Sequence, residues 1–386
     1  MSIAPGAMLG LLGGGQLGRM FTMAAQSMGY RVTVLDPADN SPSSSIADRH
    51  LRADYLDRDA LRELGLSCAG VTTEFENVPA EALRTLAEYC VVSPASSSVA
   101  VAQNRIQEKK FLTANGFEVA PYIVIHNPGN SHSVNGSALQ AHPETYSHLF
   151  PGILKLSHLG YDGRGQVPVN NAAELESAFA GMNREPCVLE KLMPLESEIS
   201  VIVGRGFDGE AVTFPVPENQ HRRGILDVSI VPARVSPDII RKAQEIASDI
   251  AGKLGYHGVL CVEFFVLAAG KLVVNEVAPR PHNSGHYTID ACITSQFEQQ
   301  VRILCGMPLG SIEMRGAAVM VNLLGDLWRQ EEPDWKRVLR YPNVKLHLYG
   351  KVAARPGRKM GHYTVLDETA EAALQLALEI KQSLER

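Results

Sequence analysis

The sequence has few cysteines, no long apolar run and no excess of positive charge. Its six cysteines form no CxxC pair and several lie within apolar segments, which indicates buried, reduced thiols. No uninterrupted apolar stretch approaches the roughly 20 residues that span a bilayer. The net charge of −6 argues against general binding to nucleic acid or membrane surfaces. Because the N-terminus also lacks the positive region of a signal peptide, we expect a cytoplasmic protein.

The length and composition indicate an ordinary globular protein of two or three domains. The chain has 386 residues, of which 45 % are hydrophobic and 20 % are charged. Its strand and helix patterns predict a mixed α/β and α+β fold, with residues 1–102 as a Rossmann-like α/β domain. Residues 103–313 are expected to form a central domain and residues 314–386 a small C-terminal domain. The polar segment 126–148 is expected to be a loop or a poorly ordered insertion.

A glycine-rich loop between two predicted strands is the first candidate binding site. The strand Met8–Leu12 leads into Gly13-Gly-Gly-Gln-Leu-Gly18, which fits the GxGxxG pattern, and Asp36 ends the next strand. Taken alone, this unit predicts a dinucleotide site and an NAD-dependent oxidoreductase. That function would leave the carboxylates and basic residues further along the chain without a role. A third predicted strand, Gly70–Thr73, leads into the acidic segment 74–79, where α/β sheets commonly bind ligands.

Two glutamates on adjacent predicted strands form a candidate metal site. A two-residue loop at Ala269-Gly270 would place Glu263 directly opposite Glu276 in an antiparallel hairpin. Like charges so placed repel each other unless a cation lies between them. With an amide oxygen from Asn275, the two carboxylates favour Mg²⁺. The alternative is one carboxylate that faces solvent, since a register shift of one residue would put the pair on opposite faces.

Several basic groups surround this hairpin in the sequence. Arg280, His282 and His286 follow it on a loop broken by prolines, and we expect all three to lie beside the metal and to favour an anion there. A predicted helix places Arg105 and Lys109 one turn apart on one face. A solvated helix face is the ordinary interpretation of such a pair.

A second glycine-rich loop, Gly160-Tyr-Asp-Gly-Arg-Gly-Gln166, lies between two short predicted strands. Its glycines free backbone N–H groups to curl round a phosphate, and Lys155 upstream supplies a positive charge. The alternative is a glycine hairpin without a ligand.

Together, these segments resemble the motifs of a known enzyme family. Lys155, the 160–166 loop, Glu190-Lys-Leu-Met193, Glu198, Glu263 and Asn275-Glu276 are similar to those of the ATP-grasp fold, which holds ATP between two α+β lobes. Within that fold the chain resembles the 5-(carboxyamino)imidazole ribonucleotide synthetases of purine biosynthesis over nearly its full length. The segments that carry this closer resemblance are 71–79, 160–166, 275–286 and 355–362. It implies an ATP-grasp domain with a lid over about 120–193, between the N-terminal Rossmann-like domain and the small C-terminal domain.

The resemblance implies a binding site for ATP and Mg²⁺. Arg105 and Lys155 would contact the phosphates, the backbone from Glu190 to Met193 would meet adenine, and Glu198 would accept the ribose hydroxyls. The implied ATP-binding residues are Arg105, Lys155, Gly160, Tyr161, Asp162, Gly163, Arg164, Gly165, Gln166, Glu190, Lys191, Leu192, Met193, Glu198, His221, Asn275 and Glu276. Glu263 and Glu276 would hold the metal.

The family reaction uses ATP to phosphorylate bicarbonate, and the carboxyphosphate formed carboxylates the exocyclic amine of 5-aminoimidazole ribonucleotide. Arg280 and His282 would orient the bicarbonate or carboxyphosphate, because a planar guanidinium matches a pair of oxyanion oxygens. Asp162 would contact the attacking amine and receive its proton. The implied substrate-binding residues are Glu76, Tyr161, Lys351 and Arg358, the last two gripping the ribonucleotide phosphate.

Three other functions compete with this one. The first is the NAD-dependent oxidoreductase, and the second is an inactive nucleotide-binding module, which would normally have lost a metal carboxylate. The third is another ATP-grasp enzyme, either a biotin-dependent carboxylase or a formate-using ribonucleotide transformylase. The expected partners are small-molecule substrates and a second copy of the chain in a homodimer, with no nucleic acid and no membrane.

Overall fold

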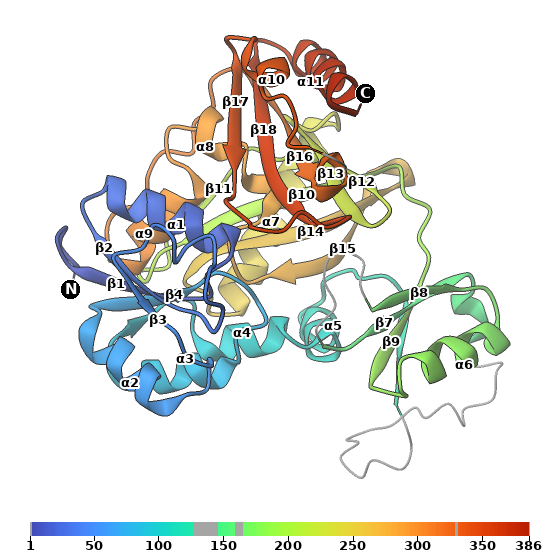
Figure 1. Cartoon of the computed structure of the whole chain (residues 1–386). Coiled ribbons are helices and arrows are strands. Elements are labelled where there is room, and N and C mark those ends of the chain that lie inside the picture. The colour runs from blue at the N-terminus through green and yellow to red at the C-terminus, as the bar shows by residue number, and fades with distance from the viewer. Residues whose placement is uncertain (1, 127–145, 159–164, 329–330, 386) are drawn as a thin grey trace.

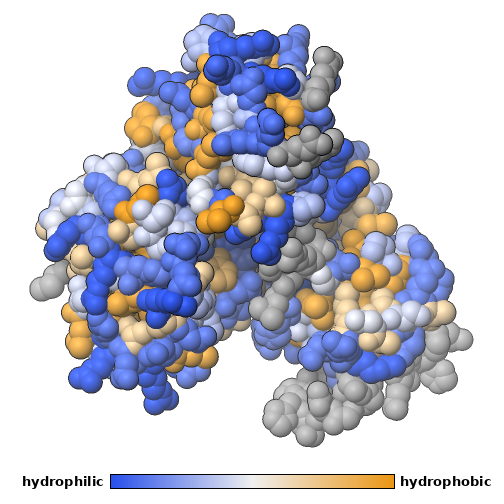
Figure 2. Space-filling model, in the orientation of Figure 1, coloured by the Kyte–Doolittle hydropathy of each residue, from blue (hydrophilic) through white to orange (hydrophobic). Residues whose placement is uncertain are grey.

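The computed structural model describes residues 2–126, 146–158, 165–328 and 331–385. These residues form three lobes (Figure 1). Figure 2 shows the three lobes meeting at the centre of the molecule, with hydrophilic side chains over much of each. No helix among the described residues is long and apolar enough to cross a membrane.

The N-terminal lobe is a parallel α/β layer, as the sequence predicts. In sheet order its strands are β3 (Arg49–Leu51), β2 (Arg31–Leu35), β1 (Met8–Leu12), β4 (Gly70–Thr73) and β5 (Val91–Val92). The helices of this lobe are α1 (Gln16–Ser27), α2 (Arg58–Ser67), α3 (Ala80–Leu86) and α4 (Ser96–Ala102). Strands β1 and β2 are short apolar segments that are almost wholly buried, because helices cover a parallel sheet on both faces.

A nine-stranded sheet forms the centre of the molecule. Its path is β15 (Lys271–Ala278), β14 (Gly258–Leu267), β10 (Ser197–Arg205), β12 (Glu218–Arg222), β13 (Ile225–Val231), β16 (Ala317–Leu324), β18 (Lys359–Asp367) and β17 (Val344–Leu348), with β11 (Ala211–Thr213) beside β10. Helix α7 (Pro237–Lys253) begins at the Ser236 cap, and its alanines and isoleucines pack on β10 and β14. The C-terminal strands thus continue the central sheet through the β13–β16 pair, with α10 (Lys336–Leu339) and α11 (Ala370–Glu385) packed against them.

The third lobe is a small antiparallel sheet. Its strands, in order, are β6 (Tyr122–Ile125), β9 (Cys187–Lys191), β7 (Gly152–Leu156) and β8 (Gln166–Val169), and α6 (Ala172–Gly181) covers it. Helix α5 (Arg105–Ala114) lies between this lobe and the N-terminal lobe in Figure 1. Because α5 lies where the lobes meet, its polar face can reach groups from each of them.

Helix α9 (Gln296–Leu304) holds the N-terminal lobe to the central sheet. Phe297 and Val301 pack into the core around β1 and α1, whereas Ile303 packs against Val259 and Cys261 of β14. The short α8 (Thr288–Ala291) precedes it.

Candidate active site

The two predicted metal carboxylates lie opposite each other on the β14–β15 hairpin. Glu263 pairs with Glu276, as predicted. The turn differs from the prediction, because its loop is the three-residue segment Ala268–Gly270 rather than two residues. An irregularity in register leaves Asn275 as an extra residue in β15, and this β-bulge restores the pairing of the glutamates.

Each of these carboxylates has a basic side chain beside it. Arg105 lies 3.4 Å from Glu276 Oε2, and His282 Nε2 lies 3.0 Å from Glu263 Oε1. Burial alone would raise the pKa of Glu263, but the hydrogen bond and charge of His282, with the charges of His221 and Arg280, lower that pKa to about 2. Glu263 is therefore ionised at neutral pH and can act as a metal ligand.

Asn275 completes an oxygen-rich group. Its Nδ2 donates to Glu263 Oε2 at 3.5 Å, while its buried Oδ1 has no hydrogen-bond partner among the residues that the structure describes. A buried carbonyl oxygen without a partner is costly unless a donor or a cation occupies the space beside it. The oxygen atoms that Asn275, Glu263 and Glu276 offer to a metal are all hard ligands, which fit Mg²⁺.

Helix α5 places two cations in the interior rather than on a solvated face. The Asn104 side chain caps the helix by accepting from the N–H groups of Ile106 and Gln107. One turn apart on that helix, Arg105 is only 9 % exposed and Lys109 is fully buried. The ordinary interpretation of this pair as a solvated face is therefore wrong.

Lys109, Lys155 and Glu190 form a buried ion cluster that joins α5 to the third lobe. Glu190 lies 3.0 Å from Lys155 and 3.5 Å from Lys109, which also donates to the Asn275 carbonyl at 3.0 Å. Burial raises the pKa of Glu190, but the two lysines and Arg105 outweigh it and lower the pKa to about 2. Lys109 was missed as a site residue, and only its one-turn spacing from Arg105 could have indicated it.

In the segment after Glu190 (residues 191–193, here called the hinge), two backbone N–H groups are already hydrogen-bonded within the protein. The N–H groups of Lys191 and Leu192 donate to the carbonyls of Pro121 and Pro151, each at 2.9 Å. An adenine ring would therefore rely on the hinge carbonyls and on the N–H of Met193. The Met193 side chain packs with the small cluster around Ala120.

Glu198 and His221 face each other on β10 and β12. His221 Nδ1 lies 3.2 Å from Glu198 Oε2, and both side chains are about a quarter exposed. Burial lowers the pKa of His221, but the hydrogen bond to Glu198 and its charge give a net rise. The pair thus offers one carboxylate and one imidazole at the edge of the site.

The residues of the second glycine loop fall partly outside the described part of the chain. Gly160, Tyr161, Asp162, Gly163 and Arg164 lie there, so the structure does not bear on their predicted roles. Gly165 is described: it has a φ of 68°, and its carbonyl accepts from the Leu156 N–H at 2.9 Å. Gln166 then pairs with Lys155 in the β7–β8 ladder.

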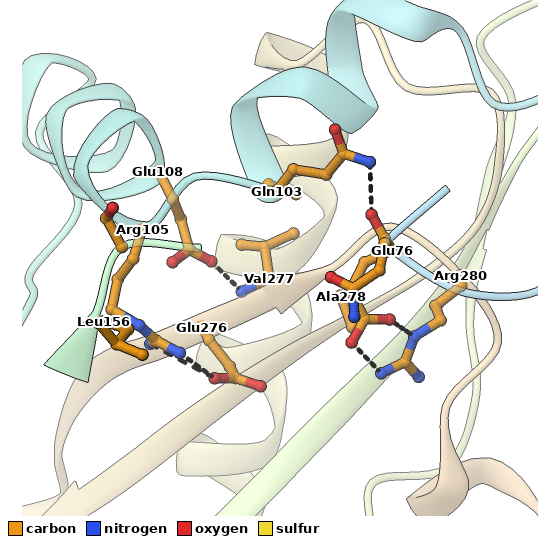
Figure 3. A pocket seen from close by; sticks show the side chains of 12 residues that line it. Glu76, Gln103, Arg105, Glu108, Leu156, Glu276, Val277, Ala278 and Arg280 are labelled. Atoms are coloured by element: carbon orange, nitrogen blue, oxygen red, sulfur yellow. Dashed lines mark hydrogen bonds and ion pairs between the residues drawn. The ribbon is translucent and has the colours of Figure 1, made fainter. Parts of the chain in front are cut away.

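Arg280 and Glu76 form a two-pronged ion pair between the central sheet and the N-terminal lobe (Figure 3). Arg280 Nη2 donates to Glu76 Oε1 at 3.0 Å, Nε donates to Glu76 Oε2, and Nη1 donates to the Pro281 carbonyl at 3.1 Å. Burial raises the pKa of Glu76, but Arg280 produces a net lowering. Two of the five guanidinium N–H groups are left without an acceptor among the described residues.

The pocket in Figure 3 joins these groups. Arg105, Glu276 and Arg280 line one cavity together with Glu76 and Glu108. Burial raises the pKa of Glu108 to about 7, and one of its oxygens accepts from the Val277 N–H at 2.5 Å. The cavity therefore lies at the junction of all three lobes and carries both signs of charge.

His286 does not belong to this site, contrary to the sequence-based expectation. Its ring is fully buried 5.7 Å from the Phe297 ring, and Gln296 lies 3.2 Å from its Nδ1. Burial lowers its pKa well below the usual value, so that the ring is neutral. By contrast, His282 is held in place, since its Nδ1 lies 2.8 Å from the Ser284 hydroxyl.

The N-terminal glycine loop is occupied by the chain's own carboxylates. Gly15 and Gly18 donate to Glu74 at 2.5 and 2.8 Å, and Gly14 donates to Asp36 at 2.7 Å. Burial raises the pKa of Glu74 to about 7, despite these hydrogen bonds. Glu74 lies where a dinucleotide pyrophosphate would bind, which argues against the oxidoreductase.

The basic loop between β17 and β18 (residues 351–358) folds back on itself. The Arg358 N–H donates to the Arg355 carbonyl at 2.9 Å, and the Arg358 side chain donates to the Ala353 carbonyl at 2.7 Å. Lys351 donates to Gln16 at the start of α1 and to the Lys359 carbonyl. Lys351 thus lies beside the N-terminal lobe.

Comparison with known proteins gives one consistent result. Residues 110–297 match the ATP-grasp domain, residues 7–103 the ribonucleotide synthetase preATP-grasp domain, and residues 318–376 the phosphoribosylaminoimidazole carboxylase C-terminal domain. The chain is 42 % identical over 373 residues to the N5-carboxyaminoimidazole ribonucleotide synthase of Bacillus subtilis, covering 97 % of this chain and 95 % of that protein. It is also 42 % identical to the Brucella melitensis enzyme of the same name, over 94 % of this chain and 97 % of that protein.

Solved structures agree with the sequence relatives. An N5-carboxyaminoimidazole ribonucleotide synthetase in complex with ADP superposes with a TM-score of 0.90 at 41 % identity, covering 100 % of this chain and 99 % of that one. The Aspergillus clavatus enzyme, in complex with ADP and 5-aminoimidazole ribonucleotide, has a TM-score of 0.88 at 33 % identity, over 98 and 99 % of the two chains. The chain therefore belongs to the N5-carboxyaminoimidazole ribonucleotide synthase family of ATP-grasp proteins.

Proposed function

We propose that this chain is an ATP-dependent ligase that carboxylates the exocyclic amine of 5-aminoimidazole ribonucleotide in purine biosynthesis. A bicarbonate oxygen attacks the γ-phosphorus of ATP, which gives carboxyphosphate and ADP. The amine nitrogen then attacks the carboxyl carbon of carboxyphosphate, the C–O bond to phosphate breaks, and the amine loses a proton. The products are 5-(carboxyamino)imidazole ribonucleotide, ADP and phosphate. The family relationship and the substrate complex of the Aspergillus relative support this reaction.

The observation that carries the proposal is that Arg105, Glu276 and Arg280 line one pocket. Phosphoryl transfer needs positive charge around the phosphates, and Arg105 and Lys155 supply it. Carboxyphosphate must stay near its place of formation until the amine attacks it. A single cavity that holds phosphate-binding and carboxylate-binding cations meets that need.

Glu263, Glu276 and the orphan oxygen of Asn275 fit a magnesium ion, and we propose that they hold it. When bound, Mg²⁺ neutralises negative charge on the ATP phosphates. Arg105 lies 3.4 Å from Glu276, so it could contact a phosphate that is bound to the metal. His282 holds Glu263 in position from the other side.

Arg280 is proposed to orient bicarbonate and carboxyphosphate. Glu76 accepts from Nε and Nη2, which fixes the guanidinium plane, and one N–H on each of Nη1 and Nη2 is left for a second planar anion. Glu76 is thereby proposed as a positioning residue for Arg280, and its contact with the substrate stays a proposal based on the family resemblance. Its charge matters, since a neutral side chain would hold the guanidinium less firmly.

The roles of Lys351, Arg358, Tyr161 and Asp162 in substrate binding stay proposals based on the family resemblance. Lys351 lies beside Gln16 of the N-terminal lobe, which is compatible with a ribonucleotide phosphate held between this lobe and the basic loop. The same resemblance supports Asp162 as the acceptor of the amine proton. We also propose a homodimer that acts in the cytoplasm, which sedimentation and fractionation can test.

An ADP-release assay with omitted components tests the function. We expect ADP only when ATP, Mg²⁺, bicarbonate and 5-aminoimidazole ribonucleotide are all present, with one carboxylated product formed per ADP. Formate in place of bicarbonate, or biotin in place of the ribonucleotide, should give no product. Product formed with formate or biotin instead would favour the transformylase or the biotin-dependent carboxylase.

A further inference from the structure

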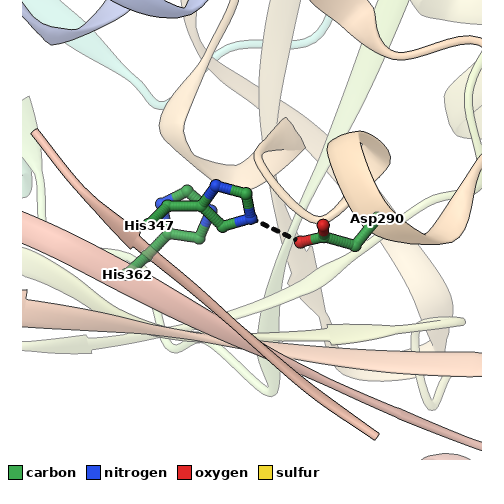
Figure 4. A group of neighbouring side chains, drawn as sticks. All are labelled: Asp290, His347 and His362. Carbon is green, nitrogen blue, oxygen red and sulfur yellow. Dashed lines mark hydrogen bonds and ion pairs between the residues drawn. The ribbon is translucent and has the colours of Figure 1, made fainter. Parts of the chain in front are cut away.

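A second cluster of ligating side chains lies outside the ATP pocket (Figure 4). Asp290 of α8, His347 of β17 and His362 of β18 each offer one ligand atom, and these atoms lie within 4.8 Å of one another. His347 Nε2 lies 2.8 Å from Asp290 Oδ2. The two imidazoles come from directly paired positions of adjacent strands and are stacked, with ring centroids 4.6 Å apart.

One nitrogen of this cluster lacks a partner. His362 is fully buried, and its Nδ1 lies 2.8 Å from the Tyr349 hydroxyl, while its Nε2 has no hydrogen-bond partner among the described residues. A buried imidazole nitrogen in this state is costly unless something binds it. If the Tyr349 oxygen accepts from Nδ1–H, the lone pair of Nε2 is left free, as in histidines that bind metals. Burial lowers the pKa of His362 well below its usual value, so the ring is neutral.

We propose that Asp290, His347 and His362 bind a divalent transition-metal ion, with Zn²⁺ as the best fit. Two imidazoles and one carboxylate suit zinc and leave a fourth position for water, whereas Mg²⁺ prefers oxygen ligands. Ligand atoms around tetrahedral zinc lie about 3.3 Å apart, so the cluster must contract from its present spread. His347 can move toward the buried His362 because its side chain is 24 % exposed.

This site would connect two parts of the active-site architecture. Asp290 lies on α8, shortly after the segment that carries Arg280 and His282, whereas His347 and His362 lie on the strands that flank the basic loop. A metal bound here would cross-link that segment to those strands. We therefore expect Zn²⁺ to raise the thermal stability of the protein without taking part in the chemistry.

Isothermal titration of the full chain with Zn²⁺, in excess Mg²⁺ and ADP, tests the proposal. We expect one strong site in the wild type, and His347→Gln should weaken its affinity by at least about tenfold. His347 is partly exposed and lies outside the ATP pocket, so this variant should fold and keep its activity in the absence of zinc. Asp290→Asn should also weaken the zinc affinity. Co²⁺ in place of Zn²⁺ should give visible absorption bands in the wild type that both variants lack.

Two controls separate this site from others. His257→Gln alters a histidine that stacks on Phe207, far from the cluster in sequence, and should bind Zn²⁺ like the wild type. Glu276→Gln, which alters the proposed magnesium site, should also keep the strong zinc site. The proposal is wrong if the wild type binds no Zn²⁺, if His347→Gln and Asp290→Asn bind it as tightly as the wild type, or if only Glu276→Gln loses it.

Discussion

Glu276 lies directly opposite Glu263 because Asn275 forms a bulge between the turn and the carboxylates. Without the bulge, the three-residue loop would place Glu263 opposite Asn275, and Glu276 would point to the other face of the hairpin. The bulge thus puts two carboxylates on one face, and it also places the Asn275 side chain among them. β-Bulges commonly re-aim side chains next to active sites.

Replacing Glu276 by Gln should abolish ADP formation while the fold stays intact. The change removes one of two carboxylates proposed to hold Mg²⁺ and leaves Arg105 without its ionic partner. The steady-state rate at saturating Mg²⁺ is the measurement, and Glu118→Gln, at an exposed position, is the matched control. Retention of more than about a tenth of wild-type activity would exclude Glu276 as a required metal ligand.

Replacing Glu76 by Gln should raise the KM for bicarbonate by about tenfold, because a neutral side chain fixes the Arg280 guanidinium less firmly. The KM for ATP should change little, since Arg105 and Lys155 remain in place. Initial rates at varied bicarbonate and at varied ATP separate the two effects. A similar increase in both constants would instead indicate that the junction of the lobes has been disturbed.

Local sequence patterns predict the strands and helices of the site well, because apolar runs, caps and glycines act over short distances. The strands Met8–Leu12 and Gly70–Thr73 are examples. The Glu263–Glu276 pairing was predicted correctly from a wrong turn, because the longer loop and the bulge cancel. No local rule indicates the longer loop or the bulge. In the loop, Ala269 adopts a positive φ of 58°, which is uncommon for a residue other than glycine.

Long-range contacts account for what the sequence could not predict. Glu74 fills the glycine loop from 56 residues beyond Gly18, so the loop looks like a dinucleotide site until the fold brings them together. His286 looks cationic in sequence but is buried beside Phe297. Lys109 looks solvated because burial of a lysine depends on a distant partner, here Glu190.

Replacing Lys109 by Met should lower the free energy of unfolding by about 3 kcal/mol, because it removes one partner from a buried ion cluster. Urea denaturation at pH 7 measures the change. Lys242→Met, at an exposed position of α7, should stay within about 0.5 kcal/mol of the wild type. Glu190→Gln should cost less in the Lys109→Met background than alone, and simple additivity would show that the two residues are not coupled.

The stability of the wild type should fall as the pH drops from about 4.5 toward 2. Although burial raises the pKa of Glu190, the lysines hold it at about 2 in the folded protein, against 4.5 in the unfolded chain, so the folded state resists protonation that the unfolded state accepts. This contribution is present above the unfolded pKa and is lost as the pH falls through the folded one. The difference in stability between the wild type and Glu190→Gln should therefore shrink from pH 5 to pH 3. A difference independent of pH would mean that Glu190 does not titrate in this way.

Replacing both Lys351 and Arg358 by Ala should raise the KM for 5-aminoimidazole ribonucleotide by roughly two orders of magnitude or more. Charge-assisted hydrogen bonds to a phosphate are typically worth about 1.5–3 kcal/mol each, and the double change removes both cations. The KM for ATP should barely move, because Lys155 and Arg105 belong to other elements of the structure. Lys345→Ala on β17 is the matched control, since it removes an exposed lysine from a neighbouring strand. Equal increases in both constants would indicate damaged packing. An unchanged ribonucleotide KM would mean that the basic loop is a solvated turn that does not bind the ribonucleotide phosphate.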